Sequence, residues 1–440
     1  MITFPRVSLV SARGGIRRLA MENQAQNKVY LHYNHTDPCR YARWNARESY
    51  EFMYERPWQE VLDFYSNAVN GCTSLSALFG IETNVHNDAE IPEISDKTES
   101  ESVSAEDRTG RWARVTFKIV LSYHGGSFDG WQKQPGLNTV QSIIERCLGK
   151  FVDEKKVELL KDKGLPIEVC SSVAGRTDKG VTALQQICSF ATWRKDIKPQ
   201  DVEEAINSAV PGKLMVKSVS GVSRVFHPNF SAKWRHYLYI FPFNGVEDGE
   251  QYGESGEDFE NFKCNENKDE QRLGCGECNG GTVENVIIDY KDELENGKKP
   301  RRFSISRVNQ LLRQLEGKLL SYKMFARDTK ASRNDGPPTQ CFVYHARAAE
   351  ARLPCSDHGE GRKVMCVELI ANRFLRKMVR VLVATSIREA AAGADEDALL
   401  KLIDATCRRA TAPPAPPDGL CLVDVGYAEF TPQNCLIPKD

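Results

Sequence analysis

The feature that most constrains the fold is a stretch of strict alternation that begins at residue 115. Apolar side chains occupy every second position there: Val115, Phe117, Ile119, Leu121 and Tyr123. This period of two predicts a strand with one buried face. A glycine-punctuated turn follows at 124–132, and Thr139 then opens a stretch with helical spacing. Because strand and helix patterns go on recurring, we expect an α+β body with a mixed sheet.

The rest of the chain repeats these patterns. Further strands are predicted at 166–172, 181–190, 214–219, 232–241, 341–351 and 363–371, and helices at 199–209, 304–320 and 374–383. The helix at 374–383 is basic on one side, which is typical of a charged face that meets solvent. A short amphipathic helix at 61–69 is expected to dock on the body. A proline-rich loop at 412–417 leads into a last strand.

Composition narrows the class of protein. At 440 residues, the chain has room for two or three domains with a sizeable core. Its 41% hydrophobic and 27% charged residues are ordinary for a globular protein. It has no run of about eighteen apolar residues, which argues against a transmembrane helix. The 14 cysteines form no tight framework, so free thiols in a reducing compartment are expected.

The net charge of −1 conceals large differences in charge between segments of the chain. Residues 111–244 hold 20 Lys and Arg against 12 Asp and Glu, and residues 301–440 hold 22 against 16. Between them, residues 245–300 hold 6 against 16. Two basic blocks around an acidic insert indicate a body that binds a polyanion.

The loop at 175–180 carries one acid between two bases. Asp178 lies between Arg176 and Lys179, and Gly175 and Gly180 bracket the loop. Nearby positive charge favours the ionised carboxylate, which is fit to act as a nucleophile or a base. Glycines allow a ligand to approach the backbone closely. Taken alone, the same pattern also fits a surface turn with a local ion pair.

The ends of the chain and its insert have compositions of their own. Residues 1–20 contain four arginines and no acid, which favours a transit segment for a chloroplast or mitochondrion; Met21 offers an alternative start, and then a nuclear or cytoplasmic protein. Residues 85–107 read as a disordered linker. The insert 245–300 holds Cys264, Cys275 and Cys278. Three cysteines are too few for a structural zinc site, so exposed thiols are the simpler expectation.

The stretches at 123–134, 175–181, 226–232, 235–239, 374–380 and 417–423 resemble, in this order, the motifs of the TruA-type tRNA pseudouridine synthases. The resemblance extends over residues 114–430 apart from the acidic insert. It implies two similar lobes, a central and mostly antiparallel sheet flanked by helices, and a basic cleft between the lobes. It also implies isomerisation of uridine to pseudouridine in tRNA, without a cofactor or metal, by a homodimer.

The resemblance assigns roles by position. Asp178 would be the catalytic carboxylate and Arg380 its ion-pair partner. Arg176 would help to hold the extruded nucleotide, Tyr237 would stack on the target base, and Leu420 would pack against that base. The chemistry requires the base to leave its stack, and an aromatic ring with an apolar wall can hold it without dictating its hydrogen bonds. Whether Asp178 attacks the ribose or removes a proton stays open.

Some positions depart from the family pattern. The family usually has Asp where His124 lies, His where Thr182 lies, and Ala-Arg where Pro228 and Asn229 lie. None of these replaces the aspartate, the tyrosine or the two arginines, so catalysis is expected to be intact. Because the altered positions flank the loop, they bear on which uridine is chosen.

These observations predict a division of the chain. Residues 1–20 are a candidate transit segment, 21–110 a partly disordered extension, 111–244 a first lobe with Asp178, 245–300 an acidic insert, and 301–440 a second lobe. The main hypothesis is a tRNA pseudouridine synthase. The alternatives are a catalytically silent RNA-binding protein that keeps the basic cleft, and an insert that serves as a zinc-dependent partner module.

Overall fold

The computed structural model describes residues 39–80, 114–244, 301–327, 338–354, 361–405 and 407–439. The candidate transit segment, the linker at 85–107 and the acidic insert with Cys264, Cys275 and Cys278 lie outside these ranges, so their predictions stay predictions. Within the described part of the chain, no helix has both the length and the apolar character needed to cross a bilayer.

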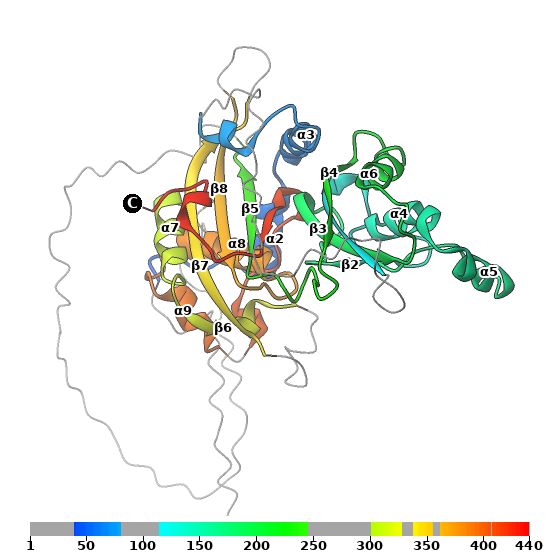
Figure 1. Ribbon diagram of the computed structural model, residues 1–440. Coiled ribbons are helices and arrows are strands. Elements are labelled where there is room, and N and C mark those ends of the chain that lie inside the picture. The colour runs from blue at the N-terminus through cyan, green and yellow to red at the C-terminus, as the bar shows by residue number, and fades with distance from the viewer. Residues whose placement is uncertain are drawn as a thin grey trace, which may run out of the picture.

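A nine-stranded sheet forms the framework of the described residues (Figure 1). Its strands are β1 (Val115–Tyr123), β2 (Ser172–Val173), β3 (Thr182–Thr192), β4 (Leu214–Val222), β5 (Trp234–Pro242), β6 (Leu319–Ser321), β7 (Gln340–Arg352), β8 (Lys363–Ala371) and β9 (Leu420–Gly426). The order is β4-β1-β3-β9-β5-β8-β7-β6, with β2 paired to β3. All pairs are antiparallel except β3 and β9. The predicted α+β class with a mostly antiparallel sheet is confirmed.

Helices cover the sheet on both faces. They are α2 (Ala46–Tyr54), α3 (Trp58–Val69), α4 (Val140–Cys147), α5 (Glu154–Asp162), α6 (Pro199–Asn207), α7 (Ile305–Arg313), α8 (Met378–Ala391) and α9 (Ala398–Ile403). One large apolar cluster joins side chains of α4, α6, α7, α8 and α9 to the sheet. A second cluster joins α3 to β5, β7, β8 and β9. Helix α5 buries none of its residues and projects from the body (Figure 1).

Strand β5 lies at the centre of this arrangement. All nine of its residues are buried. Its alternate side chains point to opposite faces, so Tyr239 and Phe241 join the large cluster while Leu238 and Ile240 join the second one. The C-terminal strand β9 pairs with β5 on one side and with β3 on the other. A segment from the end of the chain therefore connects the two parts of the sheet.

The helix expected at 61–69 docks on the body, as its apolar face predicted. It is the second half of α3, and its Val61, Tyr65 and Val69 are fully buried. The Tyr65 hydroxyl donates a hydrogen bond of 2.9 Å to the carbonyl oxygen of Gly419. This bond ties the N-terminal segment to the loop that precedes β9.

Replacing Tyr65 with Phe is expected to lower the free energy of unfolding by about 1–3 kcal/mol, because the buried Gly419 carbonyl loses its partner. The matched control is Tyr322→Phe. Tyr322 is also fully buried, but its hydroxyl finds no hydrogen-bond partner among the described residues. Its replacement should be neutral or slightly stabilising. Denaturant midpoints of the two variants would test this, and equal losses would contradict it.

Two predicted elements are shorter than expected. The strand at 166–172 is reduced to β2 because the chain there lies along α4: Val169 N–H and Ser171 N–H donate to the backbone and side chain of Glu145 at 3.2 and 2.9 Å. The helix predicted at 304–320 ends at Arg313. Gly317, at φ +69°, turns the chain before β6 begins, and its N–H donates to the carbonyl oxygen of Val343.

The prediction of a solvent-facing basic side on 374–383 is correct only in part. Arg376 is exposed, in the turn at 376–377, but α8 begins at Met378 and all fourteen of its residues are buried. Arg380 and Arg388 are 7% and 3% exposed. Buried charge is tolerated only with partners, and Arg388 pairs with Glu389 at 2.7 Å. The partner of Arg380 lies in the candidate site.

Candidate functional site

The loop that carries Asp178 lies between β2 and β3 and rests on the turn after β1. Trp131 N–H donates to the carbonyl oxygen of Thr177 at 3.1 Å. Gly130 has φ +94°, and a Cβ there would lie 3.0 Å from the backbone nitrogen of Lys179. Only a glycine lets the two backbones approach this closely without strain. The glycine-rich turn at 124–132 therefore cradles the loop.

Buried polar side chains fix the same loop from the other side. The hydroxyls of Tyr123 and Thr177 lie 2.7 Å apart. The Gln186 amide donates to the Gly175 carbonyl at 2.7 Å and to the Tyr123 hydroxyl at 3.2 Å. These contacts hold the backbone on both sides of Arg176 and leave that side chain exposed.

Asp178 is paired with a residue 202 positions away in the sequence. Arg380 Nη1 donates to Asp178 Oδ2 at 3.1 Å, and its Nε donates to the Ala415 carbonyl at 2.6 Å. The Asp178 side chain is 29% exposed and that of Arg380 is 9% exposed. The carboxylate is thus held from the buried side and open on the other.

The expectation that Lys179 flanks Asp178 electrostatically is wrong. Lys179 Nζ lies 2.8 Å from Asp129 Oδ1, and the lysine side chain is 77% exposed. Successive side chains of an extended loop point in different directions, so neighbours in sequence need not meet. The basic partner that the local sequence suggested comes instead from α8.

The backbone before α8 is unusual. Lys377 has φ +61°, and it is the one residue other than glycine with a positive φ among those described. Such a conformation costs about 1–2 kcal/mol and concentrates at functional sites. It turns the chain sharply enough to place Arg380 in the first turn of α8, where its guanidinium reaches both Asp178 and Ala415.

Leu420 follows a turn that contacts the Asp178 loop. It is the first residue of β9, is 6% exposed, and comes directly after a short 3₁₀ turn at Pro417–Gly419. Gly180 has φ +84°, and a Cβ there would lie 2.9 Å from Pro417 Cγ. The Asp178 loop and the turn that leads into Leu420 are therefore in direct contact.

Replacing Gly180 with Ala is expected to lower both stability and turnover. The left-handed backbone costs an alanine about 1–2 kcal/mol, and the methyl group would push Pro417 and the loop apart. Gly221→Ala in β4 is the control, since a Cβ there meets nothing within 4 Å and its φ is ordinary. Unfolding midpoints and activity of the two variants are the measurement. A Gly180 variant that matches the Gly221 variant would contradict the close contact.

Tyr237 lies on β5, and its hydroxyl is close to Gly175 at the start of the Asp178 loop. It is 9% exposed, and its ring meets Phe374 edge-on at 5.1 Å and 87°. A Cβ on Gly175 would lie 3.9 Å from the Tyr237 hydroxyl. Burial raises the pKa of Tyr237 to about 12, so the hydroxyl is neutral at physiological pH. The structure thus brings Asp178, Arg380, Tyr237 and Leu420 to one place, with Arg176 exposed beside them.

Arg235 is a site residue to which the sequence reasoning gave no role. It is 8% exposed and donates to the carbonyl oxygens of Ala174 and Asn372 at 3.0 and 2.8 Å. It also donates to Asn229 Oδ1 at 2.6 Å. One guanidinium therefore fastens the start of the Asp178 loop to two other turns. It is the first residue of the motif at 235–239, but nothing in that motif indicated which carbonyl groups it binds.

The departures from the family pattern have local partners. Thr182 is fully buried, and its hydroxyl accepts a bond of 3.0 Å from Gly125 N–H. His124 Nδ1 lies 3.1 Å from Ser127 Oγ, and burial lowers the pKa of its imidazole. Asn229 is held by Arg235. The side chains of Thr182 and Asn229 are thus committed to the scaffold around the loop.

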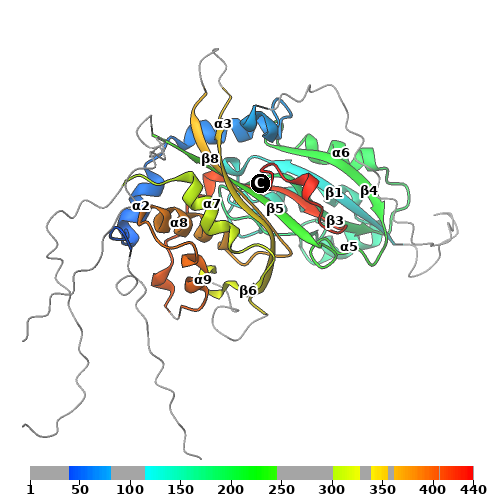
Figure 2. The same cartoon turned by 90° about the vertical axis from the view of Figure 1, so that its left-hand side faces the viewer.

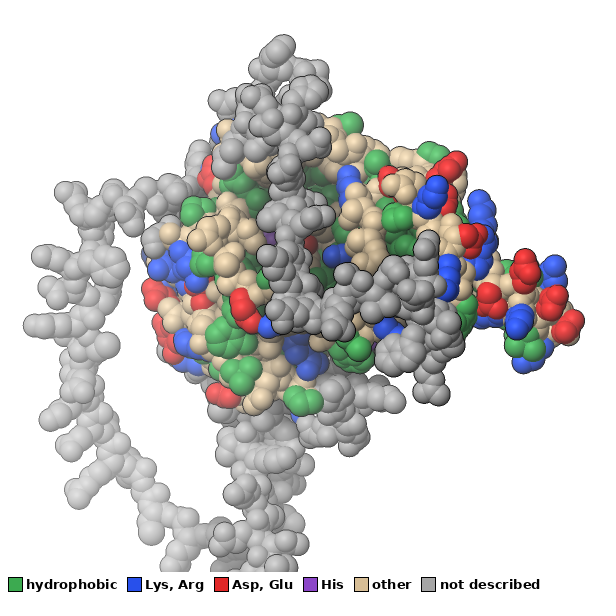
Figure 3. All heavy atoms as spheres, viewed as in Figure 1, with side chains coloured by type: hydrophobic (Ala, Val, Ile, Leu, Met, Phe, Trp, Pro, Cys, Tyr) green, Lys and Arg blue, Asp and Glu red, His purple; other side chains and the backbone are tan. Residues whose placement is uncertain are grey.

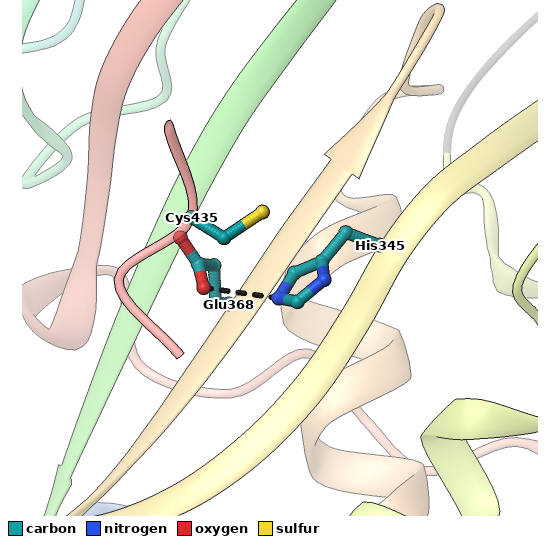
Figure 4. Close-up of side chains that lie close together, drawn as sticks. All are labelled: His345, Glu368 and Cys435. Carbon is teal, nitrogen blue, oxygen red and sulfur yellow. Dashed lines mark hydrogen bonds and ion pairs between the residues drawn. The ribbon is translucent and has the colours of Figure 1, made fainter. Parts of the chain in front are cut away.

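A second buried polar cluster surrounds Glu368 on β8 (Figure 4). His345 Nε2 lies 3.0 Å from Glu368 Oε2, and His236 Nε2 lies 2.7 Å from Oε1. Burial alone raises the pKa of Glu368, but the bonds from both histidines bring it down to about 2. Cys435 is close enough to complete a metal-binding set.

The carboxylate oxygens of Glu368 already have their full share of partners. Leu436 N–H and Ile437 N–H also donate to them, each at 2.8 Å. A metal ion on this carboxylate would have to compete with these four contacts. The set therefore fits a latch that fastens the C-terminal segment to β8 better than a metal centre.

On the face that Figure 3 shows, basic and acidic side chains are interspersed both on the body and on the projecting helix α5. Within α5, acidic Glu154, Glu158 and Asp162 alternate with lysines. The excess of positive charge in the two blocks is thus carried by the rest of the body.

Comparison with known proteins gives this geometry a context. A family model described as tRNA pseudouridine synthase matches residues 119–231 and 324–428. These ranges contain all five predicted site residues except Tyr237, and they contain the loop, α8 and the start of β9.

Individual relatives agree. The protein is 27% identical to tRNA pseudouridine synthase A of Pelodictyon phaeoclathratiforme over 70% of this chain and 98% of that one, and 26% identical to the Lacticaseibacillus casei protein of the same name over 71% and 99%. It is 38% identical to the one of Dictyoglomus thermophilum over 30% of this chain; that alignment spans about half of the relative, 49%. The chain belongs to the TruA-type tRNA pseudouridine synthase family.

Proposed function

We propose that this protein isomerises specific uridines of tRNA to pseudouridine, with Asp178 as the catalytic carboxylate. The observation that carries the proposal is the pairing of a partly exposed Asp178 with a buried Arg380, next to Leu420 and Tyr237. Family membership supplies the substrate class, since the relatives are named tRNA pseudouridine synthases.

The reaction breaks the bond between ribose C1′ and uracil N1 and forms one between C1′ and C5. The proton that C5 loses is balanced by the one that N1 gains, so no oxidant, reductant or cofactor is consumed. Asp178 would act at the ribose, either by attack on C1′ or by removal of a ribose proton. The bond from Arg380 Nη1 to Oδ2 would hold the carboxylate in place for either role.

The remaining residues would hold the extruded nucleotide. Leu420 would be an apolar wall, Tyr237 the aromatic surface, and exposed Arg176 would contact the phosphate backbone. Tyr237 is mostly covered by the loop, so its stacking on the base requires only its exposed edge or a small movement of Phe374. The two basic blocks, 111–244 and 301–440, would face the tRNA as two lobes of one cleft.

The test is recombinant protein with tRNA transcripts, read by chemical mapping specific for pseudouridine. Site-specific formation at catalytic amounts of protein is expected. Tight, salt-sensitive binding of tRNA without any pseudouridine would instead favour a silent RNA-binding protein.

The family resemblance also motivates a homodimer. Light scattering on the purified protein should then give about twice the chain mass of 49.5 kDa. A single-chain mass at micromolar concentration would contradict it.

A further inference from the structure

Part of the N-terminal segment that the family model leaves out lies against α8, the helix that carries Arg380. The family match begins at residue 119, whereas α2 and the residues just before it contact α8. Tyr41 N–H donates to the Ala392 carbonyl at 3.0 Å, just beyond the C-terminal end of α8. Arg43 and Glu389 form a buried ion pair of 2.7 Å. Figures 1 and 2 both show α2 beside α8. Helix α2 therefore runs from the far end of α8 toward Arg380.

The chain just after α2 is held against the turn that precedes Leu420. Trp58 donates from its indole N–H to the Met53 carbonyl at 3.2 Å, and its ring would meet a Cβ on Gly419 at 2.9 Å. The Arg56 guanidinium lies over the Phe52 ring at 4.1 Å. With Arg43 anchored at one end and Trp58 at the other, α2 has a defined position next to the turn that precedes Leu420.

Tyr54 is the last residue of α2, so it lies at the end of the helix that is fixed next to the turn at Pro417–Gly419. Burial raises the pKa of its hydroxyl, while the positive charge of Arg380 acts in the opposite direction.

A second tyrosine is stacked on the first. The rings of Tyr50 and Tyr54 lie 4.0 Å apart at 17°, and Tyr50 is 51% exposed. Exposed Arg47 lies one turn before Tyr50 on the same side of the helix. A flat aromatic surface of this kind offers its outer side to another ring at little cost in side-chain freedom.

We infer that Tyr50 and Tyr54 form a stacking platform for a nucleobase that flanks the target uridine in tRNA. This inference rests on the proposed function. When the uridine is extruded, its neighbour in the strand loses a stacking partner. The platform would replace that partner beside the turn that precedes Leu420, and would thereby favour the flipped state. Because every base has a π face, the platform would contribute affinity more than sequence preference.

The test compares Tyr50→Ala with wild type and with Tyr41→Ala. Tyr41 is the matched control: it is an exposed tyrosine of the same segment, 43% exposed, at the opposite end of α8. Tyr50→Ala is expected to raise KM for tRNA about 5- to 150-fold, the cost of one lost base–aromatic stack. Tyr50→Trp should keep the wild-type KM, and Tyr41→Ala should not change it.

Two further readouts separate stacking from a structural role. The slope of log Kd against log salt should be the same in Tyr50→Ala and wild type, because no phosphate contact is lost. The second readout uses two tRNAs, each with an abasic residue on one side of the mapped uridine. One of the two should bind the wild-type protein more weakly than intact tRNA does. Tyr50→Ala should bind that same tRNA no more weakly than it binds intact tRNA.

The outcomes distinguish the two proposals. Wild type that makes no pseudouridine would overturn the proposed function, and the platform would then be judged on the Kd for tRNA alone. Active wild type with an unchanged KM and Kd in Tyr50→Ala would overturn the platform, as would an equal effect of Tyr41→Ala.

Discussion

Replacing Asp178 with asparagine is expected to reduce pseudouridine formation by about 10²- to 10⁴-fold or more. The side chain keeps its size and can still accept the bond from Arg380, which now measures 3.1 Å. It can no longer attack the ribose or take a proton, because the amide is neither nucleophilic nor basic. Turnover of a mapped tRNA transcript is the measurement.

The control is Asp196→Asn, which removes a carboxylate that is 64% exposed and pairs with Arg194 on the surface. It should leave turnover unchanged, since surface pairs contribute little. The affinity of Asp178→Asn for tRNA should stay close to that of wild type, which would show that the chemical step is lost rather than binding. Undiminished turnover in Asp178→Asn would remove this residue from the mechanism.

Replacing Glu368 with glutamine is expected to destabilise the protein by about 3–5 kcal/mol, the usual cost of breaking a buried charge network. Glu368 is fully buried, and two histidines and two backbone N–H groups surround its oxygens. An amide NH₂ would face one of those donors and would leave the histidines without their carboxylate. The midpoint of denaturant unfolding is the measurement, with Glu429→Gln, at an exposed pair with Lys233, as the control.

The same group gives a pH dependence of defined sign. The pKa of Glu368 is lowered from 4.5 to about 2 in the folded protein. A lowered carboxyl pKa stabilises the folded state above the unfolded pKa, and this stabilisation is lost as pH falls through the folded one. The difference between wild type and Glu368→Gln should therefore be full at neutral pH and shrink between pH 4.5 and 2. A difference that stayed constant across that window would contradict the network.

Much of the fold could be predicted because local patterns record burial. The alternation from Val115 to Tyr123 matches β1 residue for residue, and Thr139 caps α4 by accepting from Ser142 N–H. Patterns failed where a residue's environment is set by a distant segment. The basic side of 374–383 suggested solvent, yet Arg380 is buried because the Asp178 carboxylate and the Ala415 carbonyl, both distant in the sequence, satisfy it.

The candidate site shows the same division. The motifs were enough to name Asp178 and the other four candidate site residues. Proximity in the sequence, however, would have given Asp178 the wrong ion-pair partner, because the neighbouring Lys179 pairs with Asp129. Arg235 and the tyrosines of α2 carried no readable signal. Their roles depend on which carbonyls and side chains the fold brings to them.

Local patterns were enough to predict an α+β protein with a glycine-bracketed loop that carries Asp178. Those features follow from periodicity and residue type, which act over a few neighbours. The tertiary structure was needed to show that β9 lies between β3 and β5, that α8 places Arg380 against Asp178, and that α2, with its two stacked tyrosines, lies along α8. These juxtapositions join residues hundreds of positions apart, and what selects them is the simultaneous burial of many apolar faces and the pairing of buried charge, which no short stretch of sequence contains.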